Sequence, residues 1–359
     1  MNQVISTVLV PPLLLATDGS PSSRFAQKLL YPIARILPRD ANGSSPQLVF
    51  VTVIPRPSRR SRKRMKDPVT LAESQPEPLQ PPLTDSKTPE SDRPSQQTAE
   101  QLLAEVTAAI PADLEWQTQL RQGRPATEIL NSARSLQAGL IAVGQRGIGG
   151  VKELLLGSVS CVIARYAPCS VLVARGEVAD SDRQPSLNHV LLLVDRSAAT
   201  QQAIAAVRQL VPAGVQRLTL LAVQPPIKTP YLYGPFFGPT PSWQLSQSVQ
   251  AVQKEEGQQL LEKAQANLQD LKLEIQLLVQ TGDAGPLICQ VGQRQQINLI
   301  LLGSDWKPRS LSTPFPPLRR RQSTDSLKPA IALRNTRLSP TEDYVIHHAP
   351  CPVLLCRTP

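Results

Sequence analysis

The sequence predicts an α/β fold built from two tandem copies of one domain, each an open five-stranded parallel sheet with helices on both faces. Apolar runs of strand length alternate with amphipathic helical patterns, which is typical of right-handed βαβ crossovers. The segments around Asp18 and Asp195 also resemble each other, as do the segments that end at Arg175 and Arg357. The two copies are offset by about 180 residues, which indicates an internal repeat.

In the first copy, a strand over residues 13–17 is followed by Asp18-Gly19-Ser20 and by a helix capped by Ser22 or Ser23. The remaining elements follow from apolar periodicity and from Pro125 at a helix start. They are strands over 48–54, 114–120, 140–143 and 170–174, and helices over 97–109, over 126–136 and from residue 157.

The second copy repeats this plan with strands over 189–195, 217–223, 272–280, 297–303 and 352–356. Its helices are predicted over 198–210 and 245–270, from residue 286, and in a segment that ends at His347 and His348. The predicted domains are therefore residues 1–176 and 187–359, joined by a polar linker over 177–186. Because the last strand of each copy is apolar, each should need cover, either from the other copy or in a homodimer.

The net charge of +10 comes from two predicted insertions and not from a folded basic face. Residues 56–66, inside an insertion over 55–97, hold seven basic residues and no acidic ones. Residues 305–337, inside a second insertion over 304–337, hold eight basic residues and two acidic ones. Both insertions are rich in proline, serine and charge and are predicted to be disordered. They are candidates for an acidic partner, nucleic acid or anionic lipid, although aromatic residues for base stacking do not interleave the arginines.

Cysteine and histidine usage predicts neither a disulfide framework nor a metal site. The five cysteines have no C-x-x-C spacing, and the three histidines form no metal-binding pattern. Free cysteines in apolar runs suit a reducing compartment, and the N-terminal stretch lacks the basic region of a signal peptide. We therefore expect a cytoplasmic protein without a membrane span.

The stretch over residues 140–158, LIAVGQRGIGGVKELLLGS, predicts a phosphate site. A short apolar strand ends at Gly144, Gly147 follows, and Gly157-Ser158 begins a helix. Unpaired N–H groups and the helix dipole attract anions at a helix N-terminus, and glycine permits close approach. The alternative is an ordinary glycine-containing loop.

The pattern Gly-x2-Gly-x9-Gly-Ser resembles the nucleotide-binding signature of the universal stress protein family. The segments ATDGS, QGRPATEILNSA and APCSVLVAR strengthen this resemblance, which covers nearly the whole chain outside the insertions and the linker. It implies tandem Rossmann-like domains and an ATP site, with Mg²⁺ as an accompanying ion. The residues that it implies for the site are Ala16, Asp18, Val53, Val143, Gly144, Arg146, Gly147, Gly157, Ser158, Val159 and Ser160.

In that family the acid at Asp18 binds ribose, Ala16 flanks the nucleoside and the end of the second strand, at Val53, contacts adenine. The glycine loop lines the base, ribose and phosphates, and residues 157–160 complete the phosphate cradle. Each assignment has an alternative. Asp18 could cap a turn, Val53 could be core, Arg146 could be a solvated loop charge and Ser158 a plain helix cap.

The second copy departs from this pattern, because it has no second glycine after Gly303 and has Ser339-Pro340 in place of Gly157-Ser158. Proline has no N–H for a phosphate, so the second site is predicted to be degenerate. No nucleophile–base pair or phosphate-loop lysine is evident, so we expect a regulatory protein that binds ATP in its first half, with the second half as its partner. A nucleotide-independent scaffold and a slow ATPase are the alternatives.

Overall fold

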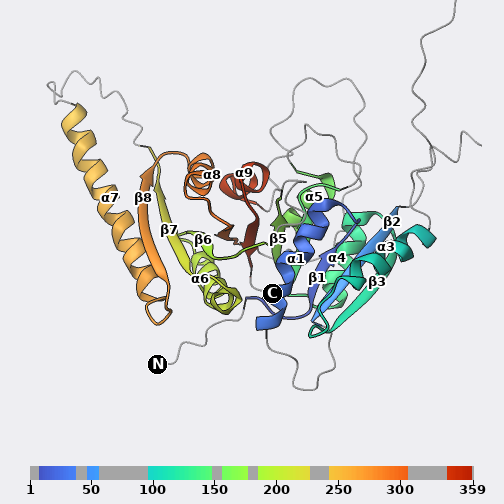
Figure 1. Cartoon of the computed structure of the whole chain (residues 1–359). Helices are drawn as coiled ribbons and strands as arrows, with labels where there is room; N and C mark the ends of the chain where they lie inside the picture. Colours follow the sequence, from blue (N-terminus) through green and yellow to red (C-terminus); the bar gives the residue numbers. More distant parts are fainter. Residues whose placement is uncertain are drawn as a thin grey trace, which may run out of the picture.

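The computed structural model describes residues 8–37, 47–55, 96–147, 156–176, 185–226, 242–305 and 338–357, and for residues 242–248 and Gln96 only the backbone (Figure 1). The basic stretch over 56–66, Lys152 in the glycine loop and the arginines over 319–321 lie outside these ranges. The predicted disorder of the two insertions, apart from their end residues, therefore also falls outside the described residues.

The strands of the described residues form one sheet in the order β3-β2-β1-β4-β5-β10-β9-β6-β7-β8. The first half contributes β1 (Leu13–Ala16), β2 (Leu48–Pro55), β3 (Trp116–Gly123), β4 (Leu140–Gly144) and β5 (Ser170–Ala174). The second half contributes β6 (His189–Leu193), β7 (Arg217–Gln224), β8 (Glu274–Thr281), β9 (Leu299–Gly303) and β10 (Val353–Cys356). Each half has the same parallel strand order, which confirms the predicted fold class.

Helices cover both faces of this sheet, and each face is shared by the two halves (Figure 1). One layer consists of α1 (Pro21–Ile36), α3 (Gln96–Ala108), α6 (Ala199–Leu210) and α7 (Ser242–Ala266). The opposite layer consists of α4 (Pro125–Ser135), α5 (Ser158–Tyr166), α8 (Ala284–Arg294) and α9 (Pro340–His348). A single 3₁₀ turn, η2 (Val211–Ala213), follows α6.

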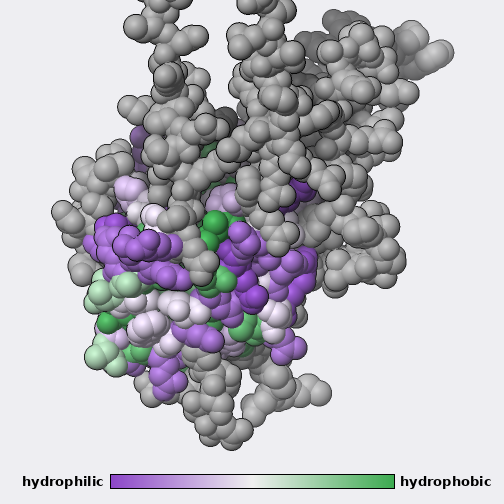
Figure 2. All heavy atoms as spheres, turned by 90° about the vertical axis from the view of Figure 1, so that its right-hand side faces the viewer, coloured by the Kyte–Doolittle hydropathy of each residue, from purple (hydrophilic) through white to green (hydrophobic). Residues whose placement is uncertain are grey.

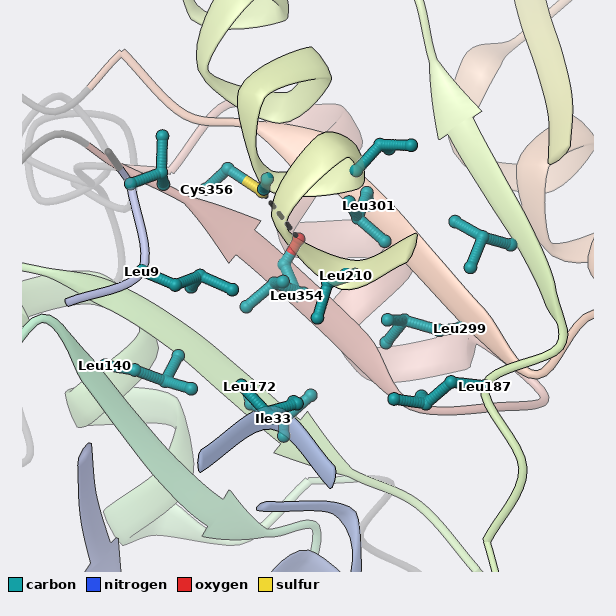
Figure 3. Packing of buried hydrophobic residues seen from close by; sticks show 14 of the residues in the cluster. Leu9, Ile33, Leu140, Leu172, Leu187, Leu210, Leu299, Leu301, Leu354 and Cys356 are labelled. Atoms are coloured by element: carbon teal, nitrogen blue, oxygen red, sulfur yellow. Dashed lines mark hydrogen bonds between the residues drawn. The ribbon is translucent and has the colours of Figure 1, made fainter. Parts of the chain in front are cut away.

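The apolar core is continuous from one half to the other. Figure 3 shows Ile33 of α1 and Leu172 of β5 in the same cluster as Leu210, Leu299 and Leu354 of the second half. Central strands such as β4 and β5 are buried along their whole length, as expected for parallel strands covered on both faces. The two halves therefore stabilise each other through shared apolar burial.

Several element boundaries differ from the sequence prediction, and two of these differences have a clear local cause. The helix after β1 is capped by Ser20, whose side chain accepts from the Ser23 N–H, and neither Ser22 nor Ser23 is the cap. Pro21 takes the first helical position, where its missing N–H has no helical partner to lose. The third strand begins at Trp116 and not at residue 114, because Leu114 closes a turn on Pro111 and the register pairs Trp116 with Leu48.

The two halves meet through β5 and β10, which pair antiparallel with Leu354 opposite Leu172. This confirms that the closing strands need cover and that the two copies supply it to each other. Only this pair of strands breaks the parallel order of the described sheet. The segment before β1 adds a further link, since Gln209 on α6 accepts from the Leu9 N–H at 2.8 Å and donates to the Leu9 carbonyl at 3.0 Å.

Two arginines form hydrogen bonds across this junction, each with a helix of the other half. Arg357, directly after β10, is completely buried and donates to the Ala164 and Ala167 carbonyls at the end of α5, at 2.6 Å and 3.0 Å. Arg175, directly after β5, donates to the Ile346 carbonyl of α9. A cation at a helix C-terminus is favourable because the last carbonyls carry partial negative charge. We call these two interactions the reciprocal arginine contacts.

Among the described residues, the face of the first half that Figure 2 shows is mainly hydrophilic. Figure 2 shows apolar residues there only in small, separate areas among the described residues. Among the large apolar side chains described on this half, Trp116 on the edge strand β3 is 45% exposed. Across the described residues, we find no helix with the length and apolar character that crossing a membrane requires.

Candidate functional site

The candidate site lies where the strand order of the first half reverses. β1 sits between β2 and β4, and Ala16 is in register with both Val51 and Val143. The segments after β1 and β4 and the end of β2 therefore meet at one edge of the sheet, at the carboxyl ends of the strands. Ligands bind at such a switch point in open α/β sheets.

Asp18 stands at this edge in contact with the glycine loop. Its Oδ1 accepts from the Ser20 N–H at 3.1 Å, so the predicted turn role is present. The backbone of Gly147 approaches the other carboxylate oxygen so closely that a Cβ at this position would collide with Oδ2. The structure thus brings Asp18 and Gly147 together, as the sequence reasoning expected.

Ser20 joins the two loops, a role that sequence reasoning missed. Its hydroxyl donates to the Arg146 carbonyl at 3.1 Å and also accepts from the Ser23 N–H at the start of α1. The segment after β1 and the loop after β4 are thereby held at a defined separation. The ATDGS motif was the available signal, but the partner lies 126 residues away.

Gly144 has a packing role. A Cβ there would lie 2.8 Å from main-chain atoms of Ser22 and Ser23 at the start of α1. Gly303, its counterpart in the second half, meets the main chain of Ala199 and Thr200 at the start of α6 in the same way. Close contact between strand and helix therefore accounts for Gly144 and for Gly303 alike. Only Gly147 and Gly157 distinguish the first half.

The N-terminus of α5 is the part of the site suited to an anion. Its cap residue is Gly157, and no side chain accepts a capping hydrogen bond. The Gly157 N–H donates to the Gln145 carbonyl at 2.8 Å, and the Ser160 hydroxyl donates to the Gly144 carbonyl at 2.7 Å. These two bonds fix the helix start against the loop, while Ser158 is exposed and Val159 half-buried.

The corresponding helix in the second half is capped by its own residues. The Ser339 hydroxyl accepts from the Glu342 N–H at 3.2 Å, and a Glu342 carboxylate oxygen accepts from the Ser339 N–H at 2.5 Å. Asp195, the counterpart of Asp18, accepts from the Ser197 hydroxyl and from the Thr200 hydroxyl, each at 2.6 Å. The positions equivalent to the candidate anion site of the first half are thus occupied internally in the second.

The remaining residues predicted for the site differ in how far a ligand could reach their side chains. Val143 is 2% exposed and packs in the core, so any ligand contact by this residue would use its main chain. Ala16 and Val53 are half-buried against the same cluster. Arg146 is also half-buried, and its Nε is buried without a hydrogen-bond partner, which does not fit the alternative of a solvated loop charge.

Burial shifts the pKa values of several titratable groups away from the candidate site. Burial raises the pKa values of Cys169 and Cys351 to about 12, so both thiols stay protonated at neutral pH. Burial also lowers the pKa of His189, whose ring lies 3.1 Å from the Thr219 hydroxyl. Among the described residues, no group of three or more His, Cys, Asp or Glu side chains is arranged to hold a metal ion.

Comparison with known proteins finds a match to the universal stress protein family over residues 60–175. Universal stress protein YxiE of Bacillus subtilis strain 168 is 51% identical over 53 residues, which are 15% of this chain and 36% of that protein. A universal stress protein of Thermus aquaticus is 50% identical over 56 residues, which are 16% of this chain and 41% of that protein. The chain therefore spans less than half the length of these relatives.

Two solved structures match both halves together. A universal stress protein from Archaeoglobus fulgidus DSM 4304 has a TM-score of 0.52 at 17% identity, covering 96% of each chain. The functionally unknown protein PA1789 from Pseudomonas aeruginosa PAO1 has a TM-score of 0.56 at 13% identity, covering 98% of this chain and 94% of that one. At these identities the likeness concerns the fold, and it extends over the whole two-half architecture.

Proposed function

Because residues 60–175 carry a domain of the universal stress protein family, we propose that this chain is a nucleotide-binding regulatory protein that holds ATP in its first half. One observation carries the proposal, namely the difference between two equivalent helix N-termini. The start of α5 lacks a side-chain cap, whereas the start of α9 is closed by Ser339 and Glu342. A bound phosphate would supply to α5 the negative charge that Glu342 supplies to α9.

The residues around α5 fit a nucleotide. Asp18 would accept from ribose hydroxyls, and the main chain at Gly147 and Gly157–Ser160 would surround the phosphates. Ala16, Val53 and the main chain of Val143 and Gly144 would contact the nucleoside, and Arg146 would add positive charge. Mg²⁺ enters the proposal only together with ATP, whose phosphate oxygens are the ligands that this ion prefers.

In this proposal the second half is a partner and not another binding site. It closes the sheet through β10, and its own helix terminus and Asp195 are already satisfied by neighbouring side chains. The two halves of this proposal are the predicted domains, residues 1–176 and residues 187–359. Regulation would then arise because nucleotide binding stabilises a first half that shares its core with the second.

A matched pair of variants tests the site. Asp18→Asn keeps an oxygen for the Ser20 N–H but removes the charge and one acceptor, so ATP affinity should fall by about tenfold or more, as expected for a lost charge-assisted hydrogen bond. Asp195→Asn makes the same change in the second half and should leave ATP affinity unaltered. Titration calorimetry with Mg-ATP measures both variants.

Thermal or urea unfolding gives an independent measurement. ATP at 100 times its Kd should add about 2.7 kcal/mol to the free energy of unfolding of the wild-type chain. Mass spectrometry of nucleotide retained by the purified protein identifies the base and the number of phosphates. Absence of any ATP-dependent stabilisation, or equal losses in Asp18→Asn and Asp195→Asn, would overturn the assignment to the first half.

A further inference from the structure

A cavity of about 640 Å³ lies at the junction of the two halves. The first half lines it with Phe25 and Leu29 of α1, Gln145 after β4 and Arg175 after β5, and the second half with residues such as Arg217 and Asn298. None of the residues assigned to the nucleotide site lines it. The size is within the range of sites that bind small organic molecules.

The polar lining is cationic. Arg175 is 8% exposed, its Nε is buried without a partner, and its Nη2 donates to the Ile346 carbonyl. Burial and, to a smaller extent, the positive charge of Arg146 together lower the pKa of Arg175 to about 10, so a second guanidinium lies near the first. Arg217 brings a third guanidinium from the start of β7.

Among the described residues that line the cavity, none is an aspartate or a glutamate. Those residues include Gln145 and Asn298, whose side-chain amides can donate hydrogen bonds, and the apolar side chains of Phe25 and Leu29. A buried guanidinium without a carboxylate partner is costly, and an anion that accepts hydrogen bonds from it offsets this cost.

We propose that this junction cavity binds a small organic anion, carrying a carboxylate or phosphate group next to an apolar body. The charged group would be held by Arg175 and Arg217, with amide donors from both halves, and the apolar body would lie against Phe25 and Leu29. Because the cavity draws its lining from both halves, the ligand stabilises their docked arrangement. The cavity is therefore an effector site for the two-half assembly.

This site is separate from the nucleotide site but adjacent to it. Gln145 lines the cavity, and its carbonyl accepts from the Gly157 N–H at 2.8 Å at the start of α5. An anion in the cavity would therefore contact the same loop that positions the helix N-terminus. The proposal stands on the cavity lining and does not require ATP to bind.

The test uses the full chain and two probes, benzoate and phenyl phosphate, with benzyl alcohol as the uncharged control. Titration calorimetry and thermal unfolding should detect binding of at least one anion, and no binding of the alcohol. Arg217→Ala should weaken that binding by about tenfold or more, the usual size of a lost charged hydrogen bond. Arg121→Ala removes an exposed arginine from β3 and should bind the anion as the wild type does.

Further measurements separate binding in the cavity from binding in the nucleotide site and test the role of Arg175. Anion binding should persist in the presence of saturating Mg-ATP, whereas competition between the two ligands would place the anion in the nucleotide site and overturn the proposal. Arg175→Gln should also lose binding, with circular dichroism as the check on folding; Arg217→Ala keeps the test decisive if this buried variant does not fold. No heat and no thermal shift with either anion up to about 10 mM, beyond the Kd of even weak specific sites, would also overturn the proposal.

Discussion

Replacing Arg357 with alanine should destabilise the whole chain, because this completely buried side chain joins the two halves. Its guanidinium donates to the Ala164 and Ala167 carbonyls of α5 and, through Nε, to the Ser304 hydroxyl at 3.2 Å. Removing it leaves two buried helix carbonyls without their charged donor. Because Arg357 is completely buried, these carbonyls lie away from bulk solvent, and we expect solvation to recover little of the loss.

The magnitude follows from opposing terms. Each buried acceptor left unsatisfied costs about 1–3 kcal/mol. The end of α5 also loses a cation that stabilises a helix C-terminus by up to about 2 kcal/mol in a partly buried geometry. Against this loss, removing a guanidinium from water costs the wild-type fold several kcal/mol, and the variant no longer bears this cost. We therefore expect the free energy of unfolding to fall by about 2–4 kcal/mol, a large effect for one residue.

Urea unfolding with linear extrapolation measures this loss, and Arg35→Ala is the matched control. Arg35 forms an ion pair with Asp113 at 2.7 Å, but both side chains are about half-exposed, so its loss should cost at most about 1 kcal/mol. Arg357→Met, which keeps apolar volume but no donor, should remain destabilised. If Arg357→Ala proves no more destabilising than Arg35→Ala, or if Arg357→Met restores full stability, then the reciprocal arginine contacts do not stabilise the junction as argued.

Two further predictions concern packing and pH. Gly144→Ala and Gly303→Ala should each lower the free energy of unfolding by about 1–3 kcal/mol, because the added Cβ meets the start of a helix in both halves; unchanged urea midpoints would contradict this packing role. The pKa values of Cys169 and Cys351 are raised to about 12 by burial, so above the pKa of an unfolded thiol, near 9, the folded state binds more protons than the unfolded state. Stability should therefore fall as the pH rises through 9, less steeply in a Cys169→Ala/Cys351→Ala variant, and both thiols should resist alkylation at pH 8 until the chain unfolds, as followed by mass spectrometry.

The candidate site could be predicted from the sequence only in part. The strand–Gly144–Gly147–Gly157 order and the Asp-Gly-Ser turn are local patterns, and the structure brings Asp18 and Gly147 together as expected. The separate roles of the glycines could not be predicted, because the packing of Gly144 depends on a helix more than 100 residues away in the chain. The nucleotide roles of the site residues remain predictions, which the Asp18 and Asp195 variants test.

By itself, the sequence determined the parallel α/β architecture, the internal repeat and the difference between Gly157-Ser158 and Ser339-Pro340. Apolar periodicity, capping residues and glycines act within a few residues of each other, so their consequences can be predicted locally. Only the tertiary structure decided that β5 and β10 pair antiparallel and that Arg175 and Arg357 each contact the end of a helix in the other half. It also decided that a cationic cavity forms between the halves. The contact of Arg357 with Ala167 spans 190 residues, and such partners are chosen by how the two halves pack and not by any spacing along the chain.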